Sequence, residues 1–168
     1  MEIKKATLED VKDISRIHAL SWKFAYKGIV PQDYLDELEE NFWVSLFAEC
    51  IKNHDLIVQL AFEDGIPVGC ISYGKSRDEN FPDWGEIVSL YLLPEYVGKE
   101  YGDKLLESAL FDLRQSGCQS VYLWVLKENR RARHFYEKHQ WKCTKDRCIY
   151  RIKGKQLIEV RYIYSSGK

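Results

Sequence analysis

One segment, residues 86–106, constrains the fold more than any other, because it joins a strand, a short loop and a helix. The run 86–93 is rich in aliphatic residues, and Pro94 ends it because proline cannot donate to a strand ladder. Leucines and alanines recur at helical spacing over 105–113, and Gly117 is the stop signal. Such a junction directs several backbone N–H groups at one place, where the helix N-terminus adds about half a positive charge. The segment therefore predicts an anion-binding loop suited to a pyrophosphate.

Strand and turn signals occupy much of the remaining chain. Strand patterns occur at 2–6, 56–62, 66–74, 120–125, 148–152 and 157–164. Asp64-Gly65 and Lys153-Gly154-Lys155 are hairpin signals that join neighbouring strands. Because hairpins near both ends require antiparallel pairs, they argue against a purely parallel sheet.

Helices are expected at three further places. Thr7, with Asp10 three residues later, predicts a capped helix, and a second helical pattern covers 131–139. Asn41 is predicted to cap another helix, whose apolar stripe is Phe42, Trp43, Leu46, Phe47, Cys50 and Ile51. Residues 21–38, broken by Gly28 and Pro31, should form a loop with short helical pieces. The order β-α-α-β-β-β-α-β-α-β-β predicts one α+β domain over 1–168, with a mixed central sheet.

Composition narrows the class of protein. The chain has 168 residues, with 25 basic and 26 acidic side chains, so its near-neutral charge argues against a nucleic-acid or membrane-surface binder. Residues 1–20 lack the apolar core of a signal peptide, and no run approaches the roughly 18 apolar residues of a membrane span. The five cysteines form no C-x-x-C pair. We therefore expect a cytoplasmic protein with reduced thiols, mostly buried, and no metal site.

The loop at 97–102 resembles motif A of the GNAT acetyltransferases, a Gln/Arg-x-x-Gly-x-Gly/Ala sequence that wraps the pyrophosphate of acetyl-CoA. Gly102 fits that pattern, whereas Val97 replaces the Gln or Arg and Glu100 replaces the first glycine. The resemblance implies that acetyl-CoA is bound, mostly by backbone amides, at Val97, Gly98, Lys99, Glu100, Tyr101, Gly102 and Asp103. We expect a helical backbone at residue 100, which needs no glycine, with Lys99 and Lys104 offsetting the carboxylate.

Residues 126–142 resemble motif B of the same family, Asn-x-x-Ala-x-x-Phe-Tyr-x-x-x-Gly-Phe. Asn129, Ala132, Phe135 and Tyr136 match, and Gln140-Trp141 replaces the final Gly-Phe. Asn129 should cap a helix. The resemblance further implies that Asn129 binds near the pantetheine, and that Tyr136 faces the sulfur of coenzyme A.

The stretch 21–35 is similar to a subgroup of bacterial GNAT proteins in which this loop forms one wall of the acceptor site. Its sequence is SWKFAYKGIVPQDYL. The resemblance implies that Trp22 and Tyr26 line the amine pocket, together with Phe24 and Tyr34. A wall of loop aromatics that only pack on the core is the alternative.

The family resemblance implies transfer of an acetyl group from acetyl-CoA to a primary amine by direct attack. The Leu92 N–H is the candidate donor to the thioester carbonyl, because the strand stops pairing there. Tyr136, with an ordinary pKa of about 10, is the candidate acid for the leaving thiolate. Glu86 is the candidate base, or else it holds a cationic substrate. Counting by twos places Glu86 on one face of the strand, together with Val88, Leu90 and Leu92.

Other interpretations stay open. The departures at Val97 and Glu100 fit an acyl-CoA-binding sensor or a weakly active member of the fold, and a third alternative is an unrelated α/β interaction module. The run Arg130, Arg131 and Arg133 is either a solvated helix face or a contact to the phosphates of coenzyme A. The acceptor is expected to be a small-molecule or peptide amine. By analogy with related proteins, a homodimer is expected, paired through the strand at 157–164.

Overall fold

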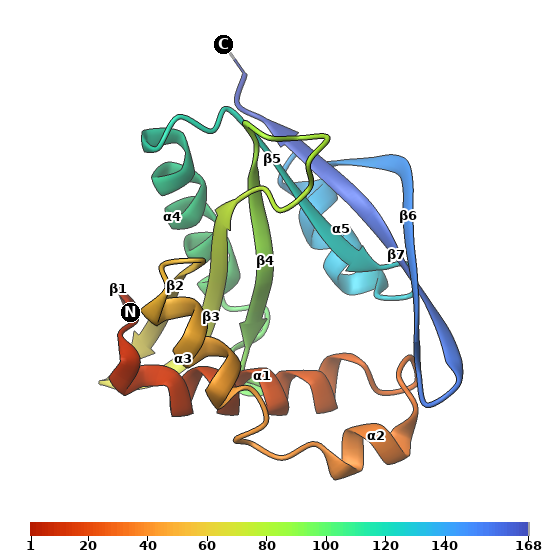
Figure 1. Cartoon of the computed structure of the whole chain (residues 1–168). Coiled ribbons are helices and arrows are strands. Elements are labelled where there is room, and N and C mark those ends of the chain that lie inside the picture. Colours follow the sequence, from red (N-terminus) through yellow and green to blue (C-terminus); the bar gives the residue numbers. More distant parts are fainter. Residues whose placement is uncertain (168) are drawn as a thin grey trace.

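A twisted mixed sheet runs through the computed structural model, which describes residues 1–167 (Figure 1). Its strands are β1 (Glu2–Lys5), β2 (Ile57–Glu63), β3 (Ile66–Lys75), β4 (Gly85–Leu92), β5 (Ser120–Leu126), β6 (Lys142–Ile152) and β7 (Lys155–Ser165). They lie in the order β1-β2-β3-β4-β5-β7-β6. Only β4 and β5 pair in parallel, and the other neighbours are antiparallel. The α+β fold with a mixed sheet is therefore as predicted.

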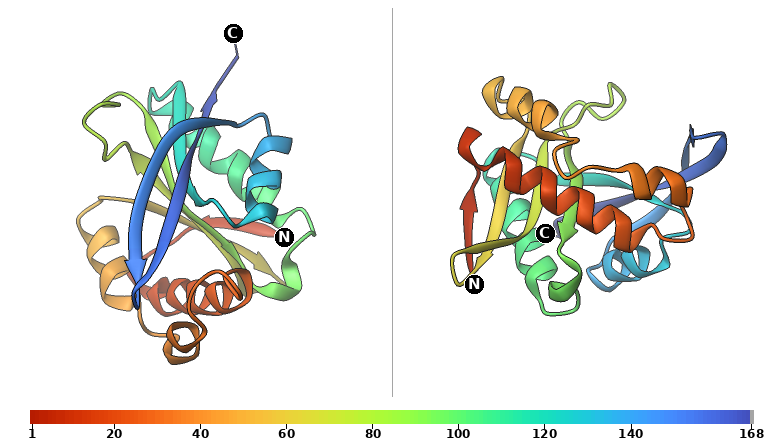
Figure 2. Two further views of the ribbon diagram at one scale, coloured as in Figure 1. Left: turned by 90° about the vertical axis from the view of Figure 1, so that its right-hand side faces the viewer. Right: turned by 90° about the horizontal axis from the view of Figure 1, so that it is seen from below.

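Helices cover both faces of this sheet (Figure 2). They are α1 (Val11–Ala25), α2 (Gln32–Glu37), α3 (Val44–Lys52), α4 (Tyr101–Gln115) and α5 (Arg130–Lys138). One apolar cluster joins α4 and α5 to residues such as Ile71 of β3, and a second joins α1 and α3 to Cys70 on its opposite side. Because neighbouring residues of a strand face opposite ways, the two clusters form separate cores.

The local signals at the predicted turns and caps are present in the structure. Thr7 and Asp10 form the reciprocal capping box, with the Thr7 amide donating to Asp10 over 2.8 Å. Asp64 and Gly65 have φ angles of 50° and 79°, and Lys153 and Gly154 have 46° and 80°. Both pairs are left-handed, as a two-residue hairpin turn requires.

Several predicted boundaries are wrong. Helix α1 continues to Ala25, because Ser21 faces the core, so the loop begins at Tyr26 rather than at Ser21. Helix α3 begins at Val44 without an Asn41 cap, and Phe42 and Leu46 of its expected stripe are 57% and 53% exposed. Cys143 and Cys148 are exposed, so the thiols are not mostly buried as expected.

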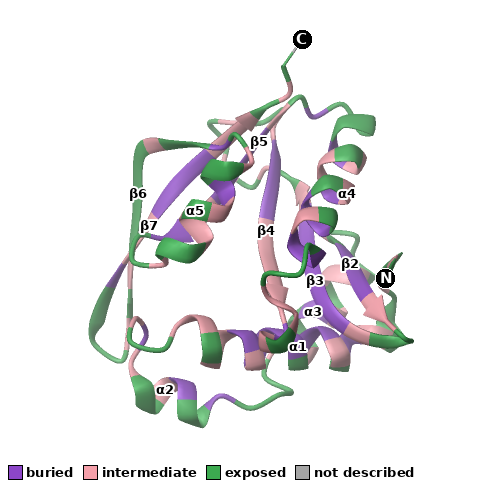
Figure 3. Ribbon diagram, turned by 180° about the vertical axis from the view of Figure 1, so that it is seen from behind, coloured by how far each residue is buried: buried purple, intermediate pink, exposed green. Residues whose placement is uncertain are grey.

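The last two strands also differ from the sequence prediction. Strand β6 starts at Lys142, not at residue 148, and forms the outer edge of the sheet, where most of its residues are exposed (Figure 3). Strand β7 lies between β5 and β6, so both of its edges are already paired. A homodimer joined through β7, as analogy suggested, is therefore excluded by the topology. The free edge on this side belongs to β6.

Candidate active site

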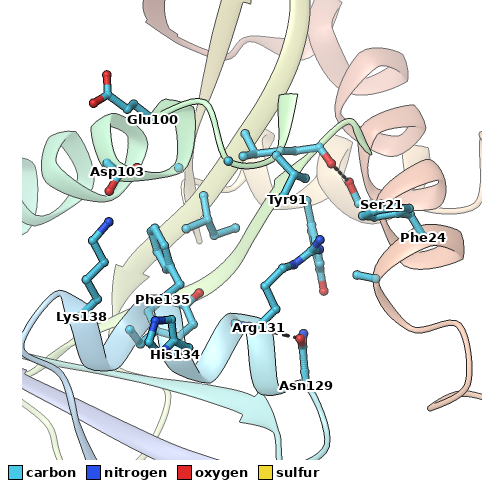
Figure 4. A pocket seen from close by; sticks show the side chains of 18 residues that line it. Ser21, Phe24, Tyr91, Glu100, Asp103, Asn129, Arg131, His134, Phe135 and Lys138 are labelled. Atoms are coloured by element: carbon cyan, nitrogen blue, oxygen red, sulfur yellow. Dashed lines mark hydrogen bonds between the residues drawn. The ribbon is translucent and has the colours of Figure 1, made fainter. Parts of the chain in front are cut away.

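A cavity of about 440 Å³ opens where β4 and β5 separate (Figure 4). The parallel pairing covers only Gly85–Ile87 on β4, opposite Val121–Leu123 on β5. Beyond that point, the cavity lies between the end of β4, the loop at 97–102, and α5, with part of α1 on one side. Its lining residues are Ser21, Phe24, Ala25, Leu90, Tyr91, Leu92, Val97, Gly98, Glu100, Gly102, Asp103, Asn129, Arg131, Ala132, His134, Phe135, Tyr136 and Lys138.

The Leu92 amide faces this opening. The Leu93 amide donates to Val68 of β3 over 2.8 Å, so by antiparallel alternation both backbone groups of Leu92 point away from β3. On that side β5 has already diverged. The Ser21 hydroxyl donates to the Leu92 carbonyl over 2.5 Å and so satisfies the acceptor that the divergence leaves unpaired. The N–H remains on the cavity side. Nothing in the sequence pattern around Ser21 signalled this contact.

The loop before α4 contains two left-handed residues. Gly98 has φ 81°, and Glu100, which directly precedes α4, has φ 65° and ψ 0°. The predicted helical backbone at residue 100 is therefore wrong. A left-handed residue with a side chain costs about 1–2 kcal/mol, which explains why the resembled pattern has glycine at this position. The Glu100 carboxylate points away from the side chains of α5 (Figure 4).

We expect Glu100→Gly to raise the free energy of unfolding by about 0.5–1 kcal/mol, because the left-handed strain outweighs the extra freedom of unfolded glycine. Coenzyme A should bind a few-fold more tightly, since the variant removes a negative charge beside an anion-binding loop. Urea unfolding and calorimetric titration measure the two effects. Glu100→Gln removes only the charge, so it should improve binding without the gain in stability. A Glu100→Gly variant that is less stable than the wild type would contradict backbone strain at residue 100.

The other residues of this loop have separate roles. Lys99 is exposed, with its ammonium 5.4 Å from the Tyr96 ring centroid. The Tyr101 hydroxyl donates to Glu63 over 2.6 Å, outside the cavity. Asp103 lines the cavity, and its carboxylate contacts His139 at 2.8 Å, which ties the start of α4 to the end of α5. The side chains of Lys99 and Tyr101 therefore do not line the cavity.

Helix α5 forms the opposite wall. Asn129 caps it, because the side-chain oxygen accepts from the Ala132 amide over 3.2 Å. Tyr136 lines the cavity and is largely buried, and burial raises the pKa of its hydroxyl well above the ordinary value. The Tyr136 hydroxyl is therefore a weaker acid in the free protein than its ordinary pKa of about 10 implies. Gln140, which replaces a glycine of motif B, is also left-handed, with φ 71°.

The arginines of α5 divide between two environments. Arg131 lines the cavity, and its guanidinium lies 5.1 Å from the Phe24 ring centroid. Arg133 donates instead to the Lys127 carbonyl and the Tyr162 hydroxyl, each over 3.0 Å. Arg130 lines a different cavity, on the far side of the helix start. Arg131 is therefore the member of this run that faces the site.

Glu86 does not line the cavity. Its buried carboxylate accepts from Arg77 through Nη2 at 2.6 Å, Nε at 3.0 Å and the backbone amide at 3.2 Å, and from Tyr122 at 3.0 Å. All four of these donors belong to this chain, so the carboxylate is held in an ion pair outside the cavity. Arg77 lies in the loop before β4, and no sequence signal linked it to Glu86.

A bulge explains the wrong face assigned to Glu86. Ser72 and Tyr73 of β3 face Ser89 and Ile87, so Val88 is an extra residue in β4. Ile87, Leu90 and Leu92 therefore share the α4 face. Glu86 lies on the other face, with Ser89 and Tyr91, and counting by twos fails across the bulge.

Trp22 and Tyr26 flank the cavity without lining it. The Tyr26 hydroxyl hydrogen-bonds the hydroxyl of Tyr91 over 2.9 Å, and Tyr91 does line the cavity. The Trp22 ring meets the Tyr26 ring edge-on, with centroids 4.8 Å apart. Phe24 of the same helix reaches the cavity directly. The aromatic segment is therefore a wall beside the opening, with Tyr91 as the link that the sequence analysis missed.

His18 is a buried core histidine outside the cavity. Its ring nitrogens contact the Ile14 carbonyl at 2.9 Å and the Ser89 hydroxyl at 3.2 Å, and its ring packs 4.7 Å from Phe47. Burial lowers the pKa of His18 to about 4, from an ordinary value of 6.5. The folded protein therefore disfavours the charged ring.

This pKa shift predicts acid sensitivity. Between pH 6.5 and 4 the unfolded chain binds a proton at His18 that the folded chain does not, so the free energy of unfolding falls as the pH falls. From pH 7 to 4.5 the His18 contribution should be about 2 kcal/mol. Urea unfolding of the wild type and His18→Gln at both values isolates it. Equal pH dependence in the two proteins would contradict a neutral buried His18.

No helix within residues 1–167 is long and apolar enough to cross a membrane. Within the same residues, no three His, Cys, Asp or Glu side chains gather as ligands for a metal ion.

Comparison with known proteins agrees with this architecture. Residues 15–141 match the acetyltransferase (GNAT) family. The uncharacterised N-acetyltransferase YuaI of Bacillus subtilis is 34% identical over 131 residues, which cover 76% of this chain and 72% of YuaI. A spermidine N(1)-acetyltransferase of Thermoplasma acidophilum is 29% identical, over 84% of this chain and 88% of that protein.

Solved structures give the same result. The PaiA N-acetyltransferase of Thermoplasma acidophilum, in complex with coenzyme A, superposes with a TM-score of 0.76 at 25% identity, covering 97% of this chain and 98% of that one. Fold, cavity and matches together define an acetyl-CoA-dependent acyltransferase. The chain belongs to the GNAT family of acetyltransferases.

Proposed function

We propose that the protein transfers the acetyl group of acetyl-CoA to a primary amine by direct attack of the nitrogen on the thioester carbonyl. The main support is that Tyr136 and the Leu92 N–H side of β4 face one cavity, which also reaches the loop before α4. A donor for the carbonyl oxygen and a donor for the sulfur are the two groups that thioester aminolysis needs most.

Coenzyme A fits the residues that line this cavity. The backbone amides of 97–103 precede and begin α4, where the helix dipole favours an anion. Leu90, Leu92 and Phe135 give an apolar path toward Tyr136, while Arg131 and Lys138 supply positive charge. We propose that this loop holds the pyrophosphate and that Asn129 lies beside the pantetheine. The bound thioester supplies the acetyl group.

The proton steps are assigned to this chain's own residues. We propose that the Leu92 N–H stabilises negative charge on the carbonyl oxygen, and that Tyr136 gives its proton to the departing sulfur. The attacking nitrogen loses its proton to solvent, and the Tyr136 hydroxyl regains a proton from solvent after the thiol has formed. Burial supports this second role, because it keeps the Tyr136 hydroxyl protonated at neutral pH. For Glu86, its bonds to Arg77 and Tyr122 favour a positioning role over the base role.

The acceptor is proposed to be a small-molecule or peptide amine, with Trp22 and Tyr26 in the wall beside it. The similarity to a spermidine acetyltransferase supports a small amine. The decisive experiment measures release of free thiol from acetyl-CoA in the presence of an amine panel that includes spermidine, an amino acid and a lysine peptide. Amine-dependent release with an acetylated product supports the proposal. Tight binding of acetyl-CoA with no release for any amine would favour the acyl-CoA sensor.

Two expectations remain. The first is that the protein is cytoplasmic and acts without nucleic acid or a membrane, and the second is that it forms a homodimer. The near-neutral composition supports the first. For the second, the exposed edge of β6 carries Lys145, Arg147 and Arg151, and such charges oppose edge-to-edge pairing of strands. We therefore propose that any dimer forms through another surface.

A further inference from the structure

A carboxylate on β7, Glu159, lies on the same face of the sheet as the acceptor wall. Its neighbour Val160 is fully buried in the core under α4 and α5, so Glu159 and Arg161 point to the opposite face. The position of Arg161 confirms this orientation. Its guanidinium carbon lies 4.7 Å from the centroid of the Tyr122 ring and 4.4 Å from that of the Trp124 ring, and both rings are on this face. Tyr122 also donates to Glu86 on that face.

Tyrosine side chains lie between Glu159 and the cavity. Cys148 of the neighbouring β6 faces Glu159 in the register, so Tyr150, two residues further along β6, points to the same face of the sheet as Glu159. Tyr26 of the acceptor wall hydrogen-bonds Tyr91, which lines the cavity. Tyr26 and Tyr150 belong to one apolar cluster at this end of the sheet. The carboxylate is therefore set among aromatic side chains next to the cavity.

No Lys, Arg or His side chain within residues 1–167 forms an ion pair with Glu159. Arg77 acts to lower the pKa of Glu159, but its guanidinium is already held by Glu86 at 2.6 Å. Arg161 on the same face is held by Asp78 at 2.8 Å. Partial burial raises the pKa of Glu159, although the Tyr150 hydroxyl and Arg77 oppose the shift. A partly buried carboxylate without an ion-pair partner is costly, unless a ligand supplies the missing charge.

We propose that Glu159 binds a second positive charge of the acceptor, so that the preferred acceptors are diamines or longer polyamines rather than monoamines. The rings of Tyr26, Tyr91 and Tyr150 suit this role, because tyrosine faces and hydroxyls both accept cationic groups. One amine of such a substrate reacts beside Leu92 and Tyr136, and the other remains protonated at Glu159. This inference rests on the proposed acetyl transfer to amines.

Matched pairs of acceptors test the proposal. With the wild type, 1,4-diaminobutane should have a KM at least tenfold below that of butylamine, at similar kcat. Glu159→Gln should raise the KM of the diamine at least tenfold and leave that of butylamine within twofold. Glu159→Asp, which keeps the charge, should retain part of the preference. Glu107→Gln makes the same charge change on an exposed face of α4 and should change nothing.

A binding measurement keeps this inference separate from the proposed function. Calorimetric titration of 1,4-diaminobutane in the presence of coenzyme A should show binding that Glu159→Gln weakens at least tenfold, even if no amine were acetylated. Acetylation of butylamine and diaminobutane with equal KM would overturn the role of Glu159 and leave acetyl transfer intact. Diamine binding through Glu159 without any acetylation would instead overturn the proposed function. An unchanged preference in Glu159→Gln, with its acetyl-CoA thermal shift intact, would also overturn the inference.

Discussion

Replacing Tyr136 with phenylalanine is expected to lower kcat about a hundredfold, the lower end of the range for losing a general acid. Tyr136 lines the cavity, and burial, by raising its pKa, keeps its hydroxyl protonated. In the variant the carbon–sulfur bond must break without a proton donor, so the negative charge on sulfur is not neutralised as it forms. The KM for acetyl-CoA should change little, because the ring and its packing against Phe135 and Trp141 remain.

Steady-state kinetics with the best acceptor of the panel gives both constants. Tyr164→Phe is the matched control, since Tyr164 packs against the same core from β7 and does not line the cavity. It should keep the wild-type kcat. A Tyr136→Phe enzyme with unchanged kcat would remove Tyr136 from the proton transfer and leave water as the acid.

Replacing Gly102 with leucine is expected to weaken the binding of coenzyme A about 10- to 100-fold. This range follows if the bound state bears the overpacking cost, which is typically about 1–3 kcal/mol. A β-carbon at residue 102 would lie 3.5 Å from the Phe135 ring and 3.7 Å from Leu92. Both of those residues line the cavity. The outer carbons of a leucine would therefore compete for space at the junction of α4, α5 and β4, where the pantetheine is proposed to pass.

Alanine at the same position provides the control. Its single methyl group makes ordinary contacts at those distances, and replacing a helical glycine should raise the free energy of unfolding by about 0.5–1 kcal/mol. Gly102→Ala should therefore bind coenzyme A as the wild type does. Calorimetric titration compares the three proteins. Equal binding by Gly102→Leu would mean that coenzyme A does not pass beside Phe135.

Local sequence signals predicted much of the framework. The turns at Asp64-Gly65 and Lys153-Gly154, the Thr7 capping box and the Asn129 cap each depend on residues within three positions of one another. Such features are set by short-range sterics and hydrogen bonds, so the sequence alone is enough to find them.

The errors arose where a local pattern was extended through a structural irregularity. The extra residue Val88 reverses the face of Glu86, and no period-2 count can detect a bulge. The left-handed backbone at Glu100 follows from how the loop must turn into α4, despite a residue that disfavours that conformation. The boundary of β6 was missed because its residues are mostly exposed and polar, which removes the alternation that marks a strand.

The sequence by itself determined the class of fold, the order of its elements and the family resemblance, because these depend on periodicity and on short motifs. Only the tertiary structure decided which side chains meet. Ser21 reaches the Leu92 carbonyl across 71 positions of sequence, and the Tyr26 and Tyr91 hydroxyls meet across 65. Arg77 forms an ion pair with Glu86, whereas Glu159 forms no ion pair with any side chain among residues 1–167. Contacts of this kind arise from how helices and strands pack, so neither the candidate base nor the proposed diamine site could be assigned before the fold was known.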